Sequence, residues 1–174
     1  MDSLFKLHGL IKPFEGLGIG EVPFVTAAAS SAVAAANRAY YQPLIIQSPV
    51  VVTHISLYVG AAVAGNVDVG IYSFDGRKIV SSGAVDTSGY TINTINTISV
   101  IPNRLGPGRY YCAVSGSSGT FTLFRISSGS TDIHNFIGEF IQASAHPLPA
   151  AATFATATVQ NSQLMYVHTS GATI

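Results

Sequence analysis

The stretch Gly65–Val85, GNVDVGIYSFDGRKIVSSGAV, decides the fold class of this chain. Val67, Val69 and Ile71 alternate with polar or small residues, which is the period of a β-strand with one buried face. The pair Asp75-Gly76 follows between two such runs. An Asp-Gly pair in this position predicts a two-residue hairpin turn of type I′, because both central residues of that turn need a positive φ.

Folding the chain at this turn sets a definite register between the two strands. Antiparallel partners share one face of a sheet, and the predicted partners are Ile71 with Val80, Val69 with Ser82, and Val67 with Ala84. The apolar members are expected to face the core. The polar residues Asp68, Arg77 and Lys78 are expected on the solvated face or in the turn.

Further strand signals follow at short intervals on both sides of the hairpin. They are AYYQPLIIQ, VVVTHISLYVG, TISVI, GRYYCAVSG, GTFTLFRIS, ATFATATVQ and QLMYVHTS. In VVVTHISLYVG the inward positions are predicted to be Val51, Thr53, Ile55, Leu57 and Val59. Pro43 predicts an edge position or a bulge in the first of these strands. The segment HPLPAAA is expected to be an extended connector.

These signals predict an all-β fold, an antiparallel β-sandwich of jelly-roll-like type with an N-terminal arm. A parallel α/β fold would need helices between the strands, and the central region offers none. We expect an extended arm over residues 1–29 and a β-sandwich domain over 30–174. The alanine-rich stretch TAAASSAVAAANRA leads into the sandwich and is a candidate helix.

Composition limits the kinds of partner. Charged residues make up 9% of the 174 residues, and eight basic residues balance eight acidic ones; a typical soluble protein has about 25%. We therefore expect neither a nucleic-acid partner nor a membrane partner, since there is no basic stripe and no apolar run near the length of a membrane span. A surface so poor in charge is poorly protected against association, which favours a protein that works inside an assembly or outside the cell.

Several motifs resemble a known family. The segment from Ala35 to Gly83, the run LGPGRYYCAVS and the late ASAHPLPAAATFA are similar, in this order, to a β-sandwich module of structural proteins in tailed phages. The resemblance covers roughly residues 30–160 and rests on turn and strand motifs. The N-terminal arm departs from the family pattern.

The resemblance implies a role in the virion, assembled in the host cytoplasm. We expect a capsid decoration or cement protein that binds the major capsid protein or other virion proteins between capsomers, as a homo-oligomer for which a trimer is one option. The alternative is a receptor- or carbohydrate-binding module of a tail fibre, spike or head fibre. The family has no catalytic residues that can be transferred to this chain.

The predicted contact residues lie in the arm and in two tyrosine pairs. The arm supplies Leu4, Phe5, Leu7, Leu10, Ile11 and Phe14, and it could dock on its own domain or on a neighbouring subunit. In Tyr40-Tyr41 and Tyr110-Tyr111 one ring of each pair must face outward if both segments are strands. We assign Tyr41 and Tyr111 to a protein interface, with sugar stacking as the alternative.

Candidates for chemistry are few, and we predict no catalytic, cofactor-binding or metal-binding residues and no enzyme activity. Cys112 is the only cysteine and alternates with strand residues, so we interpret it as a small buried hydrophobe. The five histidines lack metal-ligand spacing, and His54 is expected on the outward face of its strand. The run GLGIG lacks the strand, the further glycine and the helix of a phosphate-binding loop.

Overall fold

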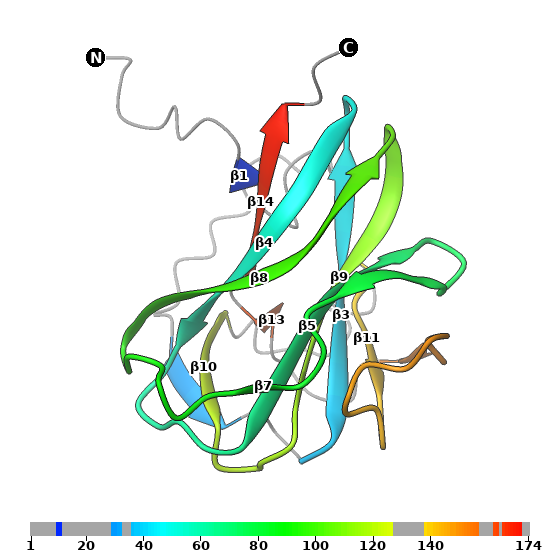
Figure 1. The fold of residues 1–174 in the computed structure, drawn as a ribbon. Coiled ribbons are helices and arrows are strands. Elements are labelled where there is room, and N and C mark those ends of the chain that lie inside the picture. Colours follow the sequence, from blue (N-terminus) through cyan, green and yellow to red (C-terminus); the bar gives the residue numbers. More distant parts are fainter. Residues whose placement is uncertain are drawn as a thin grey trace.

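A computed structural model describes residues 10–11, 29–32, 36–126, 138–156, 162–163 and 165–171 of the chain. Within these ranges the strands form two antiparallel sheets packed as a β-sandwich, as the sequence predicted (Figure 1). The first sheet contains β1 (Leu10–Ile11), β2 (Ala29–Ala32), β4 (Val50–Val59), β8 (Thr94–Leu105), β10 (Thr122–Ile126), β13 (Ser162–Gln163) and β14 (Met165–Gly171). The second contains β3 (Arg38–Ile46), β5 (Asn66–Ser73), β6 (Lys78–Ser81), β7 (Val85–Asp86), β9 (Gly108–Gly116), β11 (Phe140–Gln142) and β12 (Ala155–Thr156).

A long two-stranded ribbon links the sheets. β3 pairs with β9 in the second sheet, and the direct continuations of these strands, β4 and β8, pair with each other in the first sheet. The pairs Ile46–Gly108 and Val50–Leu105 lie on either side of the corner. Strands that pass from one sheet to the other at a corner are a recognised way to close a sandwich.

The main core lies between the sheets and is mainly aliphatic. It contains Leu44 and Ile46 of β3, Ile55 and Leu57 of β4, Val67, Val69 and Ile71 of β5, and Cys112 and Val114 of β9, among others. The buried position of Cys112 agrees with its interpretation as a small hydrophobe, and burial raises the pKa of its thiol to about 12.

The inward residues of β4 differ from the prediction in its first half. Val50 and Val52 are buried, whereas Val51 and Thr53 are partly exposed; from Ile55 onward the predicted parity holds. The ladder between β4 and β8 shifts register between Val52 and His54. An irregularity of this kind moves the following residues to the other face, and a pattern with strict period two cannot show where it occurs.

The β5–β6 hairpin has the predicted central register but a different turn. Ile71 pairs with Val80, yet Ser73 N–H donates to the Arg77 carbonyl at 2.9 Å, so the loop contains Phe74, Asp75 and Gly76. Gly76 has a φ of +87°, as in three-residue loops that end on a left-handed glycine. A register shift between Tyr72 and Ile71 compensates for the additional loop residue. Farther along, Val67 pairs with Val85 rather than with Ala84.

A second, smaller core covers the outer face of the second sheet. Residues 143–154, which we call the strap, lie over this face and appear in orange in Figure 1. The packed residues include Tyr41, Tyr72, Tyr111 and Ala113 from the sheet, and Ala145 and Leu148 from the strap. The expected extended connector therefore closes one face of the sandwich.

The described parts of residues 1–37 differ from the expectation of a helix. Ala29–Ala32 forms β2 and pairs with β10 between Thr122 and Arg125, so the helical prediction is wrong at these residues. The helix propensity of alanine is a weak preference that tertiary pairing often overrides. Leu10 and Ile11 pair with His168 and Val167 of the same chain. No helix among the described residues is long and apolar enough to cross a membrane.

Candidate functional site

The structure separates the predicted contact residues into two groups. In the arm, Leu10 and Ile11 form β1 on the β14 edge, whereas Leu4, Phe5, Leu7 and Phe14 lie outside the described residues. Tyr41 and Tyr111 do occupy the outer face of their sheet, but the strap covers them: Tyr41 is 0% exposed and Tyr111 is 5% exposed. Their rings are therefore not available at the surface, which corrects the expectation of an open tyrosine face.

The buried tyrosines hold the strap and its flanks through their hydroxyl groups. Tyr41 donates to Gln142 Oε1 at 2.9 Å, and Tyr72 donates to the Pro149 carbonyl at 2.5 Å. The two rings meet edge to face with centroids 5.2 Å apart. Burial raises the pKa of Tyr41 to about 12 and also raises the pKa of Tyr72, so both phenols stay protonated donors at neutral pH.

Asp68 of β5 makes a polar contact with the strap, although the sequence pattern predicted a solvated face for it. It is 0% exposed, and its carboxylate accepts hydrogen bonds from Leu148 N–H at 2.9 Å and Ser82 Oγ at 3.2 Å. Burial raises the pKa of this carboxyl, while those two hydrogen bonds and the nearby charges of Lys78 and His146 oppose the shift. Lys78 Nζ also donates to the Leu148 carbonyl at 2.7 Å.

A sequence signal for this covered face was present in β5. Gly70 lies between Asp68 and Tyr72 in the interior of a strand, where glycine often marks a close approach by another segment. A Cβ at Gly70 would lie 2.6 Å from the Val80 carbonyl oxygen and 3.2 Å from Leu148 Cδ1. The glycine therefore makes room for the hairpin partner and for the strap.

The first sheet brings two histidines together that are far apart in the sequence. His54 and His168 are register partners, and their ring centroids are 6.2 Å apart. His168 Nε2 and Ser56 Oγ are 2.6 Å apart, and Thr97 Oγ1 is 2.7 Å from the same oxygen. Burial, together with His54, lowers the pKa of His168.

This serine–histidine pair has limited chemical scope. Ser56 is 0% exposed, so its hydroxyl cannot reach a substrate without a movement of the strand. A triad also needs an acid that orients the histidine, and the contacts found for His168 are with Ser56 and His54. Among the residues that the structure describes, no three histidine, cysteine or acidic side chains gather in a way that could hold a metal ion.

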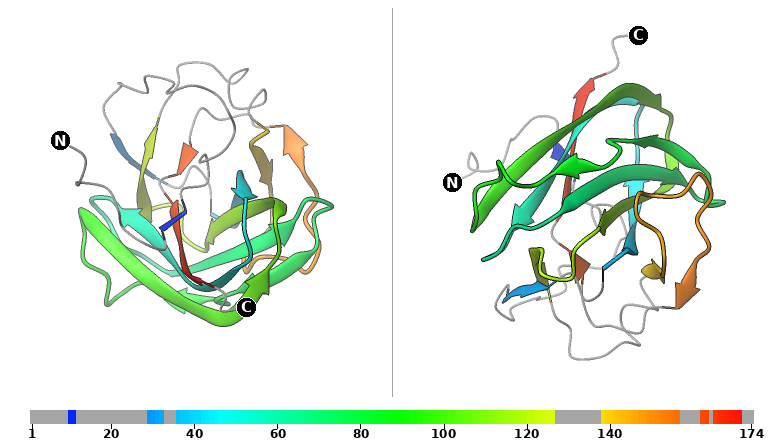
Figure 2. Two further views of the ribbon diagram at one scale, coloured as in Figure 1. Left: turned by 90° about the horizontal axis from the view of Figure 1, so that it is seen from above. Right: turned by 60° about the horizontal axis from the view of Figure 1, so that its bottom comes forward.

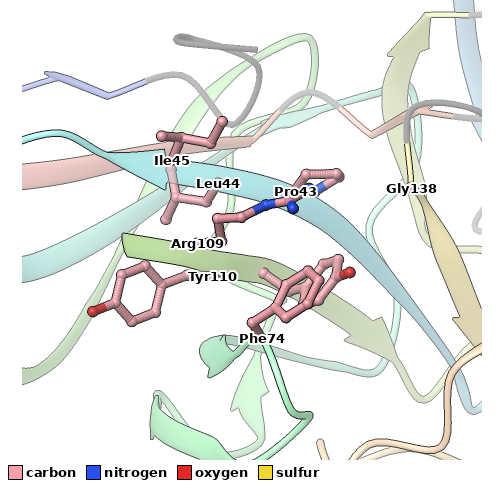
Figure 3. A pocket seen from close by; sticks show the side chains of 8 residues that line it. Pro43, Leu44, Ile45, Phe74, Arg109, Tyr110 and Gly138 are labelled. Carbon is pink, nitrogen blue, oxygen red and sulfur yellow. The ribbon is translucent and has the colours of Figure 1, made fainter. Parts of the chain in front are cut away.

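An aromatic hollow lies at the tip of the β5–β6 hairpin (Figure 3). Phe74 is 53% exposed, stacks on Tyr111 with centroids 5.9 Å apart, and has Arg109 Cζ 4.7 Å above its ring. The lining is completed by Pro43, Leu44, Ile45, Tyr110 and Gly138. A flat apolar ring beside a guanidinium could stack on a sugar or on an aromatic side chain.

The other prominent surface feature is strand β8, which carries two exposed isoleucines. Ile95 is 55% exposed and Ile101 is 77% exposed. In the left view of Figure 2 the bright green β8 runs along the outside of the molecule. Among the described strands, β8 pairs with β4 alone, so its other edge makes no strand pairing within the part of the chain that the structure describes. Unpaired strand edges are common places for another chain to bind.

Comparisons with known proteins add no assignment, because no protein-family model matches this chain and a search of curated proteins finds no significant match.

Proposed function

We propose that this chain is a structural protein of a tailed-phage virion, and specifically a capsid decoration or cement protein that binds between capsomers. The phage context is suggested by the resemblance of residues 30–160, above all by the strand and turn motifs around Gly65–Val85 and 143–155. The observation that supports a binding role most directly is the edge of β8 that no described strand pairs with, together with the exposed Ile95 and Ile101.

The proposed mechanism is association between preformed surfaces. A rigid sandwich presents a fixed edge to its neighbours, so little conformational entropy is lost when they bind. The charged fraction of 9% leaves few groups to desolvate at an interface. Apolar contact contributes roughly 25 cal/mol per Å² before the entropic cost of association, so the exposed isoleucines and the apolar arm provide the main attraction.

The arm gives the test of this proposal. Deleting residues 1–25 removes β1, whose pairing with β14 comprises two residue pairs. We expect the truncated protein to keep the circular dichroism spectrum of a folded β-protein but to lose incorporation into particles. Particles assembled without the chain would be incubated with the full-length or the truncated protein and sedimented. Equal recovery of both proteins with the particles would refute the role of the arm, and no recovery of the full-length protein would refute the virion role.

A second candidate function is supported by the aromatic hollow. A receptor- or carbohydrate-binding module would use Phe74 as a stacking surface and Arg109 as a hydrogen-bond donor. A glycan array probed with the free protein distinguishes this function: binding that is lost in Phe74→Ala but kept in Ile92→Ala would support it. Ile92 is a suitable control because it is an exposed apolar residue outside the hollow. An array without binding, together with strong binding to particles, would leave the decoration role.

A further inference from the structure

Two histidines lie side by side on the face of the first sheet that points away from the main core. His54 of β4 and His168 of β14 are register partners, and their ring centroids are 6.2 Å apart. Their chain neighbours Ile55 and Val167 point into the core, whereas both histidines are partly exposed. Residues directly opposite each other on antiparallel strands have Cβ atoms about 4.5–5.5 Å apart, so their side chains can share a ligand.

A bulge in β4 gives His54 this position. In the ladder with β14, His168 pairs with His54 and Thr169 pairs with Val52, so Thr53 is left without a register partner there. The ladder with β8 is irregular at the same residue. Thr53 and His54 are consecutive and both partly exposed, which strict alternation does not allow. Bulges often lie beside functional sites, where they change the direction of a side chain.

A hydroxyl group holds one nitrogen of each imidazole ring. His54 Nδ1 is 3.0 Å from Thr53 Oγ1, and His168 Nε2 is 2.6 Å from Ser56 Oγ. Ser56 Oγ is in turn 2.7 Å from Thr97 Oγ1, which can accept its proton. When these two ring nitrogens donate to the hydroxyl oxygens, His54 Nε2 and His168 Nδ1 each carry a lone pair. Metal-binding histidines are commonly oriented by such a hydrogen bond from their second nitrogen.

We propose that His54 and His168 together bind one divalent transition-metal ion of the zinc, copper and nickel group, for which imidazole is a preferred ligand. A zinc–nitrogen distance of about 2.0–2.1 Å places two rings on one ion with their centres about 5–6 Å apart, so the pair closes by at most about 1 Å. The outer torsion of histidine has a broad energy minimum, so this movement costs little. Among the described residues no third histidine, cysteine or acidic side chain joins the pair, so water completes the coordination.

The bound ion would connect two strands of the first sheet. β14 pairs with β4 on one side and with β1 on the other, so an ion held by His54 and His168 ties β14 to its longer neighbour. A ligand that binds the folded state alone raises the melting temperature. Zinc at about a hundred times its Kd should raise it by about 5–10 °C. Calcium prefers oxygen ligands and should have no such effect.

The first experiment is a calorimetric titration of the metal-free full chain with ZnCl₂. We expect the tightest binding event to involve one ion per chain and to weaken at least about tenfold in His54→Gln and in His168→Gln. His146→Gln is the matched control, because His146 lies on the strap with its Nδ1 3.0 Å from Ser115 Oγ, outside the first sheet. Circular dichroism without zinc checks that all three variants are folded.

The second experiment counts the ligands by electron paramagnetic resonance with Cu²⁺. The wild type should show coupling to two imidazole nitrogens, and either single variant should show coupling to one. Ser56→Ala keeps both ligands but removes the acceptor of the His168 Nε2 proton, so it should weaken zinc binding about tenfold with the nitrogen count unchanged.

Three results would overturn the proposal: no zinc binding by the wild type, unchanged binding in both histidine variants, or an equal loss in His146→Gln. Neither experiment involves a phage particle, so the metal site can fail or succeed separately from the proposed function.

Discussion

Replacing Asp68 with alanine should loosen the strap, and the structure gives the size of the effect. The substitution leaves Leu148 N–H, which now donates to Asp68 Oδ2 at 2.9 Å, without an acceptor in a buried site. An unsatisfied buried group of this kind costs about 1–3 kcal/mol. Ser82 Oγ loses the same carboxylate but keeps the Gly83 carbonyl at 2.9 Å, so it adds little. We expect Asp68→Ala to lower the free energy of unfolding by about 2 kcal/mol.

The variant Asp68→Asn separates the hydrogen bonds from the charge. Burial is the largest influence on this carboxyl and raises its pKa in the folded state above the ordinary value of 3.8. The stability that its protonated form contributes is therefore fully present below that ordinary value and is lost as the pH rises through the folded-state pKa. Asparagine cannot ionise. The stability of Asp68→Asn relative to the wild type should consequently improve as the pH is raised from about 4 to about 7.

Urea denaturation at several pH values, followed by tyrosine fluorescence because the chain has no tryptophan, measures both effects. Asp86→Ala is the control, since that carboxylate is exposed and its hydrogen bonds are local ones to Thr87 and Ser88, so its loss should cost less than about 0.5 kcal/mol. If Asp68→Ala lowers the free energy of unfolding by no more than the control variant does, the anchoring role of Asp68 is refuted. A stability difference between Asp68→Asn and wild type that stays constant with pH would refute the raised pKa.

Three further predictions concern single sites. Gln42 is buried, and neither the nitrogen nor the oxygen of its amide has a hydrogen-bond partner in the described structure. Gln42→Met should therefore raise the free energy of unfolding, measured in urea, by about 1–2 kcal/mol. A lower free energy of unfolding in this variant would show that the amide is hydrogen-bonded. Gly70→Ala should destabilise the protein by about 1–3 kcal/mol in a thermal melt, because its Cβ would lie 2.6 Å from a backbone oxygen. Gly89→Ala is the control and should be neutral, because its Cβ would meet nothing within 4 Å. Cys112, buried and with its pKa raised to about 12, should react with an aromatic disulfide reagent only after unfolding; rapid labelling of the native protein would contradict its burial.

The sequence predicted those features that depend on local pattern. The all-β class, the pairing of Ile71 with Val80 and the burial of Cys112 follow from alternation and turn residues, and the structure confirms them. The three-residue loop at Gly76 and the parity change after Val52 were not predicted, because bulges add residues that no alternation pattern records. The buried state of Asp68 was missed for a different reason. Whether this face of β5 is solvated depends on the strap, which lies some eighty residues later in the chain. In the sequence, Gly70 was the one residue of β5 that indicated a close approach by another segment.

The strap also explains why the edge of β8 that no described strand pairs with is the most suitable place for association. It seals the outer face of the second sheet with its own aromatic core, so the tyrosines that first suggested an interface are used within the chain. In the aromatic hollow, the guanidinium of Arg109 already lies over the ring of Phe74 and covers part of it. At β8, by contrast, every second residue of the regular stretch Thr94–Ser99 directs its backbone donor and acceptor away from β4, and Ile95 and Ile101 are exposed. A new partner there gains hydrogen bonds and apolar contact together without replacing a strand pairing of the described residues.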